Sequence, residues 1–296
     1  MSPTGGGSLD DVLAIAALTL REAVRRRLAW ALLLLTALVV VVTAWGFERF
    51  VQLARQDGVP ELQLQLGVSQ LLIMVAFMFS FVLAMVAVVF GSPAVAGDVE
   101  SGVALAVLAR PIRRSAYVAG RWLGLVVVVV TYAVLSGAAE EAVCAWVTGW
   151  VPPHPVEAVA YLAGEGVVLL TFALALSTRL SMITGGAIAV VLFGLAWVVG
   201  LLGRFAVLFG VDALQQAAAV SQRLLPSDTF WIGATASLEP ASSQLAQAGF
   251  AGSIAAGRFG PFYVAAPPDP LELGWAVGWI ALVLVAAVLL FERREL

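Results

Sequence analysis

Three carboxylates and one arginine lie within or at the ends of long apolar stretches, where charged groups are rare. Glu140, Glu141 and Glu165 are the acids, and Arg204 closes the fifth stretch. An ionised group at membrane depth is costly and usually faces protein or water. These four residues could line an outward-facing polar path for a substrate, with Arg204 paired to Glu140 or Glu141. The alternative is a protonated or paired structural acid at Glu165 and simple exposure at Glu140 and Glu141.

The chain carries few of the other groups that do chemistry. All 16 basic residues are arginines, so a P-loop with its phosphate-binding lysine is absent. His154 is the single histidine and sits between prolines, which favours a surface turn, and Cys144 is the single cysteine. We therefore predict no catalytic residues, no metal site and no cofactor on this chain, and an enzymatic function is disfavoured.

The composition is that of a membrane protein. Of 296 residues, 61% are hydrophobic and 12% are charged, whereas soluble domains carry about a quarter charged residues. The net charge of −3 argues against nucleic-acid binding. A membrane-spanning helix needs about 20 apolar residues, and in lipid the backbone must bond to itself. The sequence thus predicts an all-α polytopic fold with six transmembrane helices, at 28–47, 69–90, 116–147, 156–176, 183–203 and 271–291.

The arginines predict the orientation. With the N-terminus inside, the inner segments hold eleven arginines and the outer segments five. Positive residues favour the cytoplasmic side. Both termini are thus expected in the cytoplasm, in a multi-pass protein of the cell (inner) membrane.

The segment before the first stretch, 1–27, favours a cytoplasmic tail followed by an amphipathic surface helix. Ser8 is a suitable N-cap. Apolar residues then recur at helical spacing, and the polar residues include Arg21, Arg25 and Arg26. The alternative is a positively charged flank that needs only the arginines. The apolar stripe consists of Leu9, Leu13, Ala16, Leu20 and Val24.

The inner loop 91–118 has the pattern of a short cytoplasmic helix. Asp98 and Glu100 precede a helical stretch at 101–109, Pro111 ends it, and Arg113 and Arg114 follow. Acids at the start and arginines at the end match the helix dipole. Such a helix could dock into a cleft on a cytosolic partner, and the alternative is a charged loop that only sets topology.

This loop resembles the first cytoplasmic loop of type-2, export-class ABC transporter permeases. In that family an acidic turn that ends in glycine leads a coupling helix, then Leu-x-x-Pro-Ile-x-Arg, then Gly-Lys or Gly-Arg entering the third span. Val103 replaces a common threonine, and Arg121 replaces a common lysine. Within the family the chain looks nearest to permeases of multicopper-enzyme or nitrous-oxide-reductase maturation. The matching runs are Gly97-Asp98-Val99-Glu100-Ser101-Gly102, Leu108-Ala109-Arg110-Pro111-Ile112-Arg113-Arg114 and Gly120-Arg121.

The resemblance implies a half-transporter. A second permease chain, expected to be identical, would pair with it, and a cytosolic ABC ATPase dimer would bind ATP and magnesium below the bilayer. The surface helix and the coupling helix would transmit ATPase closure to the spans. An ATPase-independent secondary transporter or channel that uses Glu165 is the alternative, and a lipid-modifying enzyme is disfavoured. The implied coupling residues are Asp98, Glu100, Gly102, Leu108, Pro111, Ile112, Arg113 and Arg114.

The region 204–270 predicts a small external cap before the last span. Residues 211–225 read as one short helix and 241–256 as a second, with Pro226-Ser227-Asp228 between them. The expected organisation is therefore a tail with surface helix (1–27), five spans (28–203), this cap, and the last span with the C-terminus (271–296). Close helix packing is expected at Gly120-x-x-x-Gly124 and Gly274-x-x-x-Gly278.

Overall fold

The computed structural model describes residues 8–25, 27–104, 112–240, 264 and 266–294, and these residues form helices and no strands. The predicted all-α fold is confirmed. The helices that the structure describes are α1 (Ser8–Arg25), α2 (Arg27–Gln56), α3 (Glu61–Gly91), α4 (Pro93–Glu100), α6 (Arg114–Thr148), α7 (Pro155–Ser177), α8 (Met182–Phe209), α9 (Asp212–Leu224), α10 (Ser227–Leu238) and α13 (Pro270–Glu292).

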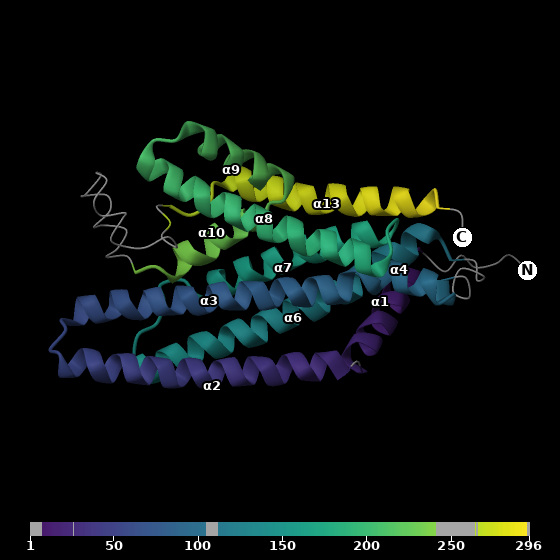
Figure 1. The fold of residues 1–296 in the computed structure, drawn as a ribbon. Helices are drawn as coiled ribbons and strands as arrows, with labels where there is room; N and C mark the ends of the chain where they lie inside the picture. Colours follow the sequence, from purple (N-terminus) through teal and green to yellow (C-terminus); the bar gives the residue numbers. More distant parts are fainter. Residues whose placement is uncertain (1–7, 26, 105–111, 241–263, 265, 295–296) are drawn as a thin grey trace, which may run out of the picture.

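Among the described residues, six helical segments are long and apolar enough to cross a membrane, as predicted. They lie side by side along one long axis, with α1 and α4 at one end (Figure 1). We call this the terminal end, because α1 begins there and α13 finishes there, and we call the opposite end, with the α2–α3 turn, the distal end. The candidate spans are Trp30–Gln56, Glu61–Glu100, Arg114–Thr148, Pro155–Ser177, Met182–Ala206 and Pro270–Glu292.

The first two spans are longer than the hydrophobic pattern predicts. Helix α2 continues beyond residue 47 and α3 begins before residue 69, so the expected polar loop is mostly helical. Hydrogen bonds between side chains three or four residues apart support these extensions. One example is the bond from Gln52 Nε2 to Glu48 Oε1, at 3.0 Å. Gly58, with φ of 67°, makes the turn between the helices.

Helix α7 forms the centre of the bundle. It packs against α3, α6, α8, α10 and α13, and it is the most buried of the spans, whereas α2 is the least buried. Its apolar residues occur on all sides, which suits a helix surrounded by others. Gly166 lets α6 approach closely, since a Cβ there would lie 2.7 Å from Val129 Cγ1.

The expected helix at 211–225 is present as α9, but the next helix is placed deeper than the sequence suggests. Every residue of α10 except Ile232 is buried, and α10 packs mainly on α7. Gly164 of α7 receives the ring of Phe230, and Gly233 of α10 receives the ring of Tyr161. Helix α10 therefore belongs to the packed bundle. The sequence analysis instead predicts only a small external cap for this region. The expected helix at 241–256 lies outside the described residues.

Candidate functional site

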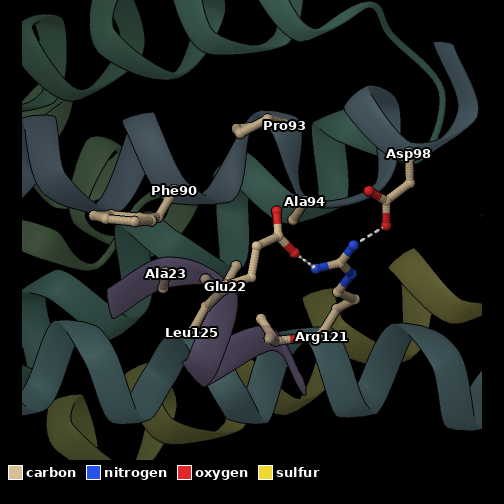
Figure 2. A pocket seen from close by; sticks show the side chains of 9 residues that line it. Glu22, Ala23, Phe90, Pro93, Ala94, Asp98, Arg121 and Leu125 are labelled. Atoms are coloured by element: carbon tan, nitrogen blue, oxygen red, sulfur yellow. Dashed lines mark hydrogen bonds and ion pairs between the residues drawn. The ribbon is translucent and has the colours of Figure 1, made fainter. Parts of the chain in front are cut away.

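Two acids of the terminal end, Glu22 and Asp98, meet at Arg121, where α1, α4 and α6 join (Figure 2). Its Nη1 donates to Glu22 Oε2 of α1 at 2.7 Å, and its Nη2 donates to Asp98 Oδ2 of α4. The same Asp98 oxygen accepts a hydrogen bond from the hydroxyl of Tyr117. One guanidinium thus connects α1, α4 and α6. Asp98 and Glu100 lie in the last turn of α4 and do not precede it, in contrast to the prediction for a helix at 101–109, most of which lies outside the described residues. We call Glu22, Asp98, Tyr117 and Arg121 the junction cluster.

The local sequence explains how these side chains meet. Tyr117 and Arg121 are four residues apart in α6, so both lie on one face of that helix. Gly120 and Gly124 lie beneath α1, and a Cβ at Gly124 would be 2.6 Å from the carbonyl oxygen of Ala16. Close packing of α1 on α6 brings Glu22 within reach of Arg121. The Gly120-x-x-x-Gly124 pattern therefore seats the surface helix, not another span.

Two of the three charged side chains in the junction cluster are largely shielded from solvent. The side chains of Arg121 and Asp98 are 12% and 14% exposed, and that of Glu22 is 43% exposed. Removing one partner of a buried ion pair leaves an uncompensated charge, which is strongly destabilising. The adjoining cavity has a volume of about 20 Å³, room for a water molecule and not for a substrate. The arrangement suits a mechanical link.

The buried face of α1 differs from the predicted stripe. Ile15, Ala16, Thr19 and Ala23 pack inward, and only Ala16 belongs to the predicted set. The exposed members of that set are Leu9, Leu13 and Val24. The helix therefore has two apolar sides. Small residues allow the close approach to α6, and the exposed leucines and valine remain free to meet lipid.

A second contact ties α4 to the start of α8. The Oε1 atom of Glu100 accepts a hydrogen bond from the backbone N–H of Met182 at 3.1 Å. The first N–H groups of a helix lack partners within it, and the helix dipole favours an anion there. Ser181 caps the same end through Thr184 N. Glu100 thus connects the inner loop to the fifth span.

Arg114 binds the end of the last span. Its Nη1 donates to the carbonyl oxygens of Glu292 at 3.0 Å and Arg294 at 2.7 Å. Arg294 in turn donates to the carbonyl oxygen of Thr178, which ends α7, at 2.7 Å. A cation at the C-terminus of a helix satisfies unpaired carbonyls and complements the dipole. Arg114 therefore holds α6, α7 and α13 together within the chain.

The remaining coupling and surface-helix residues divide into three groups. Gly102 has φ of 77° and follows α4 in the left-handed conformation, and Ile112 packs partly buried against the core. Arg113 is exposed at the N-cap of α6, and Arg21 and Arg25 are exposed on α1. The predicted residues Arg26, Leu108 and Pro111 lie outside the described residues.

The predicted substrate-path residues form separate groups. Glu165 is 2% exposed, and both its carboxylate oxygens lie 2.8 Å from the hydroxyl of Ser80 in α3. Glu140 is buried and Glu141 is partly buried, so the alternative of simple exposure is wrong for this pair. Both line a cavity of about 20 Å³ between α3, α6, α7 and α10. The structure does not bring Arg204 to either of them.

Arg204 pairs with Asp228, and the expected pairing with Glu140 or Glu141 is wrong. Its Nη1 lies 3.0 Å from Asp228 Oδ1, and Gln222 donates to Asp228 Oδ2 at 2.9 Å. A Cβ at Gly200 would be 2.6 Å from the Asp228 carboxylate, so α10 begins directly against α8. The pairing follows from the return of α10 into the bundle.

Four residues of these groups carry no role in the sequence analysis: Glu22, Tyr117, Ser80 and Asp228. Tyr117 could have been found from its spacing to Arg121, and Asp228 as an acid before an apolar segment. Ser80 and Glu22 carry no local signal.

His154 lies at the N-cap of α7 with a half-exposed side chain, and its Nδ1 is 3.5 Å from Glu157 Oε1. In the described part of the chain, no cluster of three or more histidines, cysteines or acids could hold a metal ion.

The six apolar helices in the described part of the chain define a polytopic membrane protein. The model of the ABC-2 family transporter proteins matches residues 13–296, so the chain belongs to this family and is a type-2 ABC permease. The curated proteins compared with the chain include no match. The match does not show whether the chain belongs to the subgroup of permeases for multicopper-enzyme or nitrous-oxide-reductase maturation. That assignment stays a prediction.

Proposed function

We propose that this permease is the membrane subunit of an ATP-driven exporter and that a separate cytosolic ABC ATPase dimer docks on its terminal end. The junction cluster carries the proposal. A force applied to α4 reaches α6 through Asp98 and Arg121, and it reaches α1 through Glu22. In this proposal the terminal end faces the cytoplasm, and ATP and magnesium bind to the partner.

Two further contacts spread such a movement through the bundle. Glu100 joins the inner loop to the N-terminus of α8, and Arg114 joins the start of α6 to the end of α13. The surface helix α1 and the third, fifth and last spans therefore have attachments at this end. A second copy of the chain would complete the transporter, with the substrate path between or within the two bundles.

The exposed positive residues of this end are the proposed docking contacts. The side chains of Arg113 and Arg179 have no hydrogen-bond or ion-pair partner among the described residues, and both are exposed. They suit acidic groups on an ATPase surface, because complementary charges steer and orient partners. Asp98 and Arg114 are engaged within the chain and would instead transmit the movement.

The test is ATP hydrolysis by the reconstituted permease–ATPase complex. Arg113→Glu should weaken ATPase binding, whereas Asp98→Asn should leave binding intact and lower the hydrolysis that the permease stimulates. Arg49→Gln, an exposed arginine on α2 near the distal end, is the matched control and should change neither quantity. Full binding and full stimulated hydrolysis in both test variants would contradict the proposal.

A further inference from the structure

Two cavities flank α9 on opposite sides. The larger has a volume of about 720 Å³ and lies between α8 and α9 with Phe172 of α7 beside it. The smaller has a volume of about 240 Å³ and lies between the last turn of α9, the start of α10 and the start of α13. Both reach the last turn of α9, since Ser221 and Leu224 line the larger cavity and Arg223 lines the smaller one.

The larger cavity is apolar and lies at a membrane-spanning helix. Leu192, Leu195 and Val199 of α8 belong to the candidate span Met182–Ala206, and they face Ala217 and Val220 of α9 across the cavity. Its volume falls within the range of about 300–1,000 Å³ that holds small-molecule ligands. Such a lining suits a hydrocarbon chain and offers no site for a charged ligand.

The smaller cavity carries both signs of charge. Arg223 and Glu272 line it from α9 and α13, both are exposed, and neither forms an ion pair with a described residue. Trp275 donates from its indole nitrogen to the carbonyl oxygen of Arg223 at 3.1 Å, which fixes the ring beside this arginine. Gln222 and Thr229 add an amide and a hydroxyl.

These groups complement a zwitterion. A guanidinium is well suited to a phosphate, to which it can donate two parallel hydrogen bonds. A carboxylate and the face of an indole are well suited to an ammonium group. The tryptophan also occupies the first turn or two of α13, where aromatic residues mark the interface between water and lipid.

We propose that a bilayer phospholipid with a primary amine in its headgroup binds at α9, with the headgroup in the smaller cavity and an acyl chain in the larger one. The phosphate lies on Arg223, the ammonium lies between Glu272 and Trp275, and the chain passes the last turn of α9. This site is separate from the junction cluster and does not depend on the proposed ATPase.

The experiment uses the full chain in lipid nanodiscs with trace phospholipids that carry a photoreactive group on the acyl chain. One probe has a phosphoethanolamine headgroup and the other a phosphoglycerol headgroup. Labelled peptides are identified after digestion. We expect the ethanolamine probe to label the groove residues of α8 and α9 more strongly than the lipid-facing residues Leu34 and Val41 of α2, which report ordinary annular lipid.

The variants test recognition of the phosphate and of the amine of the headgroup separately. Arg223→Gln should lower labelling of the groove by both probes about fivefold, the size of a favourable exposed ion pair. Glu272→Gln should remove only the preference for ethanolamine. Ala217→Phe, which fills the groove, should abolish groove labelling, and Arg49→Gln, an arginine on α2 near the distal end, should leave it unchanged.

Three results would overturn the proposal. Groove labelling no stronger than that of α2 would mean annular lipid only. Equal labelling by both probes in the unmodified protein would exclude recognition of the amine. Unchanged labelling in both Arg223→Gln and Glu272→Gln would exclude the smaller cavity as the headgroup site. The expected pattern of all variants would establish the site.

Discussion

Arg121 of α6 pairs with Asp98 of α4, so the short inner helix and the third span share one shielded ionic contact. The pair has a second acid, Glu22 of α1, on the same guanidinium. The pair is therefore the expected point at which loop movement enters the bundle.

Arg121→Gln is expected to lower the thermal stability of the purified permease and to reduce stimulated ATP hydrolysis. Loss of one partner from a buried ion pair costs about 3–5 kcal/mol, and the lower end applies here because the pair is slightly exposed. Glu22→Gln should have a smaller effect, since Glu22 is 43% exposed. The exchanged pair Asp98→Arg with Arg121→Asp should recover part of both losses, and equal effects of all three changes would argue against a specific pair.

Gly124→Val is expected to displace α1 from α6. A side chain there would meet the backbone oxygen of Ala16 at 2.6 Å, and backbone cannot move aside cheaply. Limited proteolysis near Arg21 and Arg25 should therefore accelerate. Gly278→Val is the matched control, because nothing lies within 4 Å of a Cβ at Gly278. Equal cleavage of the two variants would show that α1 does not depend on this seat.

Arg204→Gln and Asp228→Asn should each loosen α10, because each leaves the other charge without its partner in a shielded site. Asp228 is 4% exposed, and removal of one member of such a pair costs about 3–5 kcal/mol. Hydrogen exchange of the α10 amides is the direct measurement and should rise in both variants. Arg49→Gln changes an exposed arginine on α2 and, as the control, should leave exchange in α10 unchanged.

Glu165→Gln is expected to preserve ATP-dependent transport and stability. An amide has nearly the shape of a carboxyl group, and its oxygen can still accept the hydrogen bond from Ser80. Glu165→Leu should destabilise the bundle, since it leaves the Ser80 hydroxyl unsatisfied. Transport that an ion gradient drives without an ATPase, and that Glu165→Gln abolishes, would instead support the secondary-transporter alternative.

The terminal end is expected to face the cytoplasm. In a Cys144→Ala background, Asp57→Cys places a thiol at the exposed α2–α3 turn and Arg293→Cys places one at the exposed end of α13. A membrane-impermeant maleimide added to intact cells should label the first and not the second until the cells are opened. The reverse pattern would invert the orientation and remove the terminal end as an ATPase site.

The spans are predictable because a run of about 20 apolar residues has one stable state in a bilayer. The motif around Asp98 and Glu100 also indicates where the chain would couple to a partner. The contacts themselves are not predictable locally. Glu22 reaches Arg121 only because small residues let α1 dock on α6, and Arg204 finds Asp228 only because α10 returns into the bundle. In each case the partner is chosen by packing between segments distant in sequence.

The most direct test of the central claim is purification of the tagged chain from its native membrane in mild detergent, with identification of the chains that accompany it. The proposed function predicts a stoichiometric cytosolic ABC ATPase and measurable ATP hydrolysis, with binding reduced by Arg113→Glu. A pure permease without an ATPase and without hydrolysis, under conditions that preserve a known permease–ATPase complex, would contradict it.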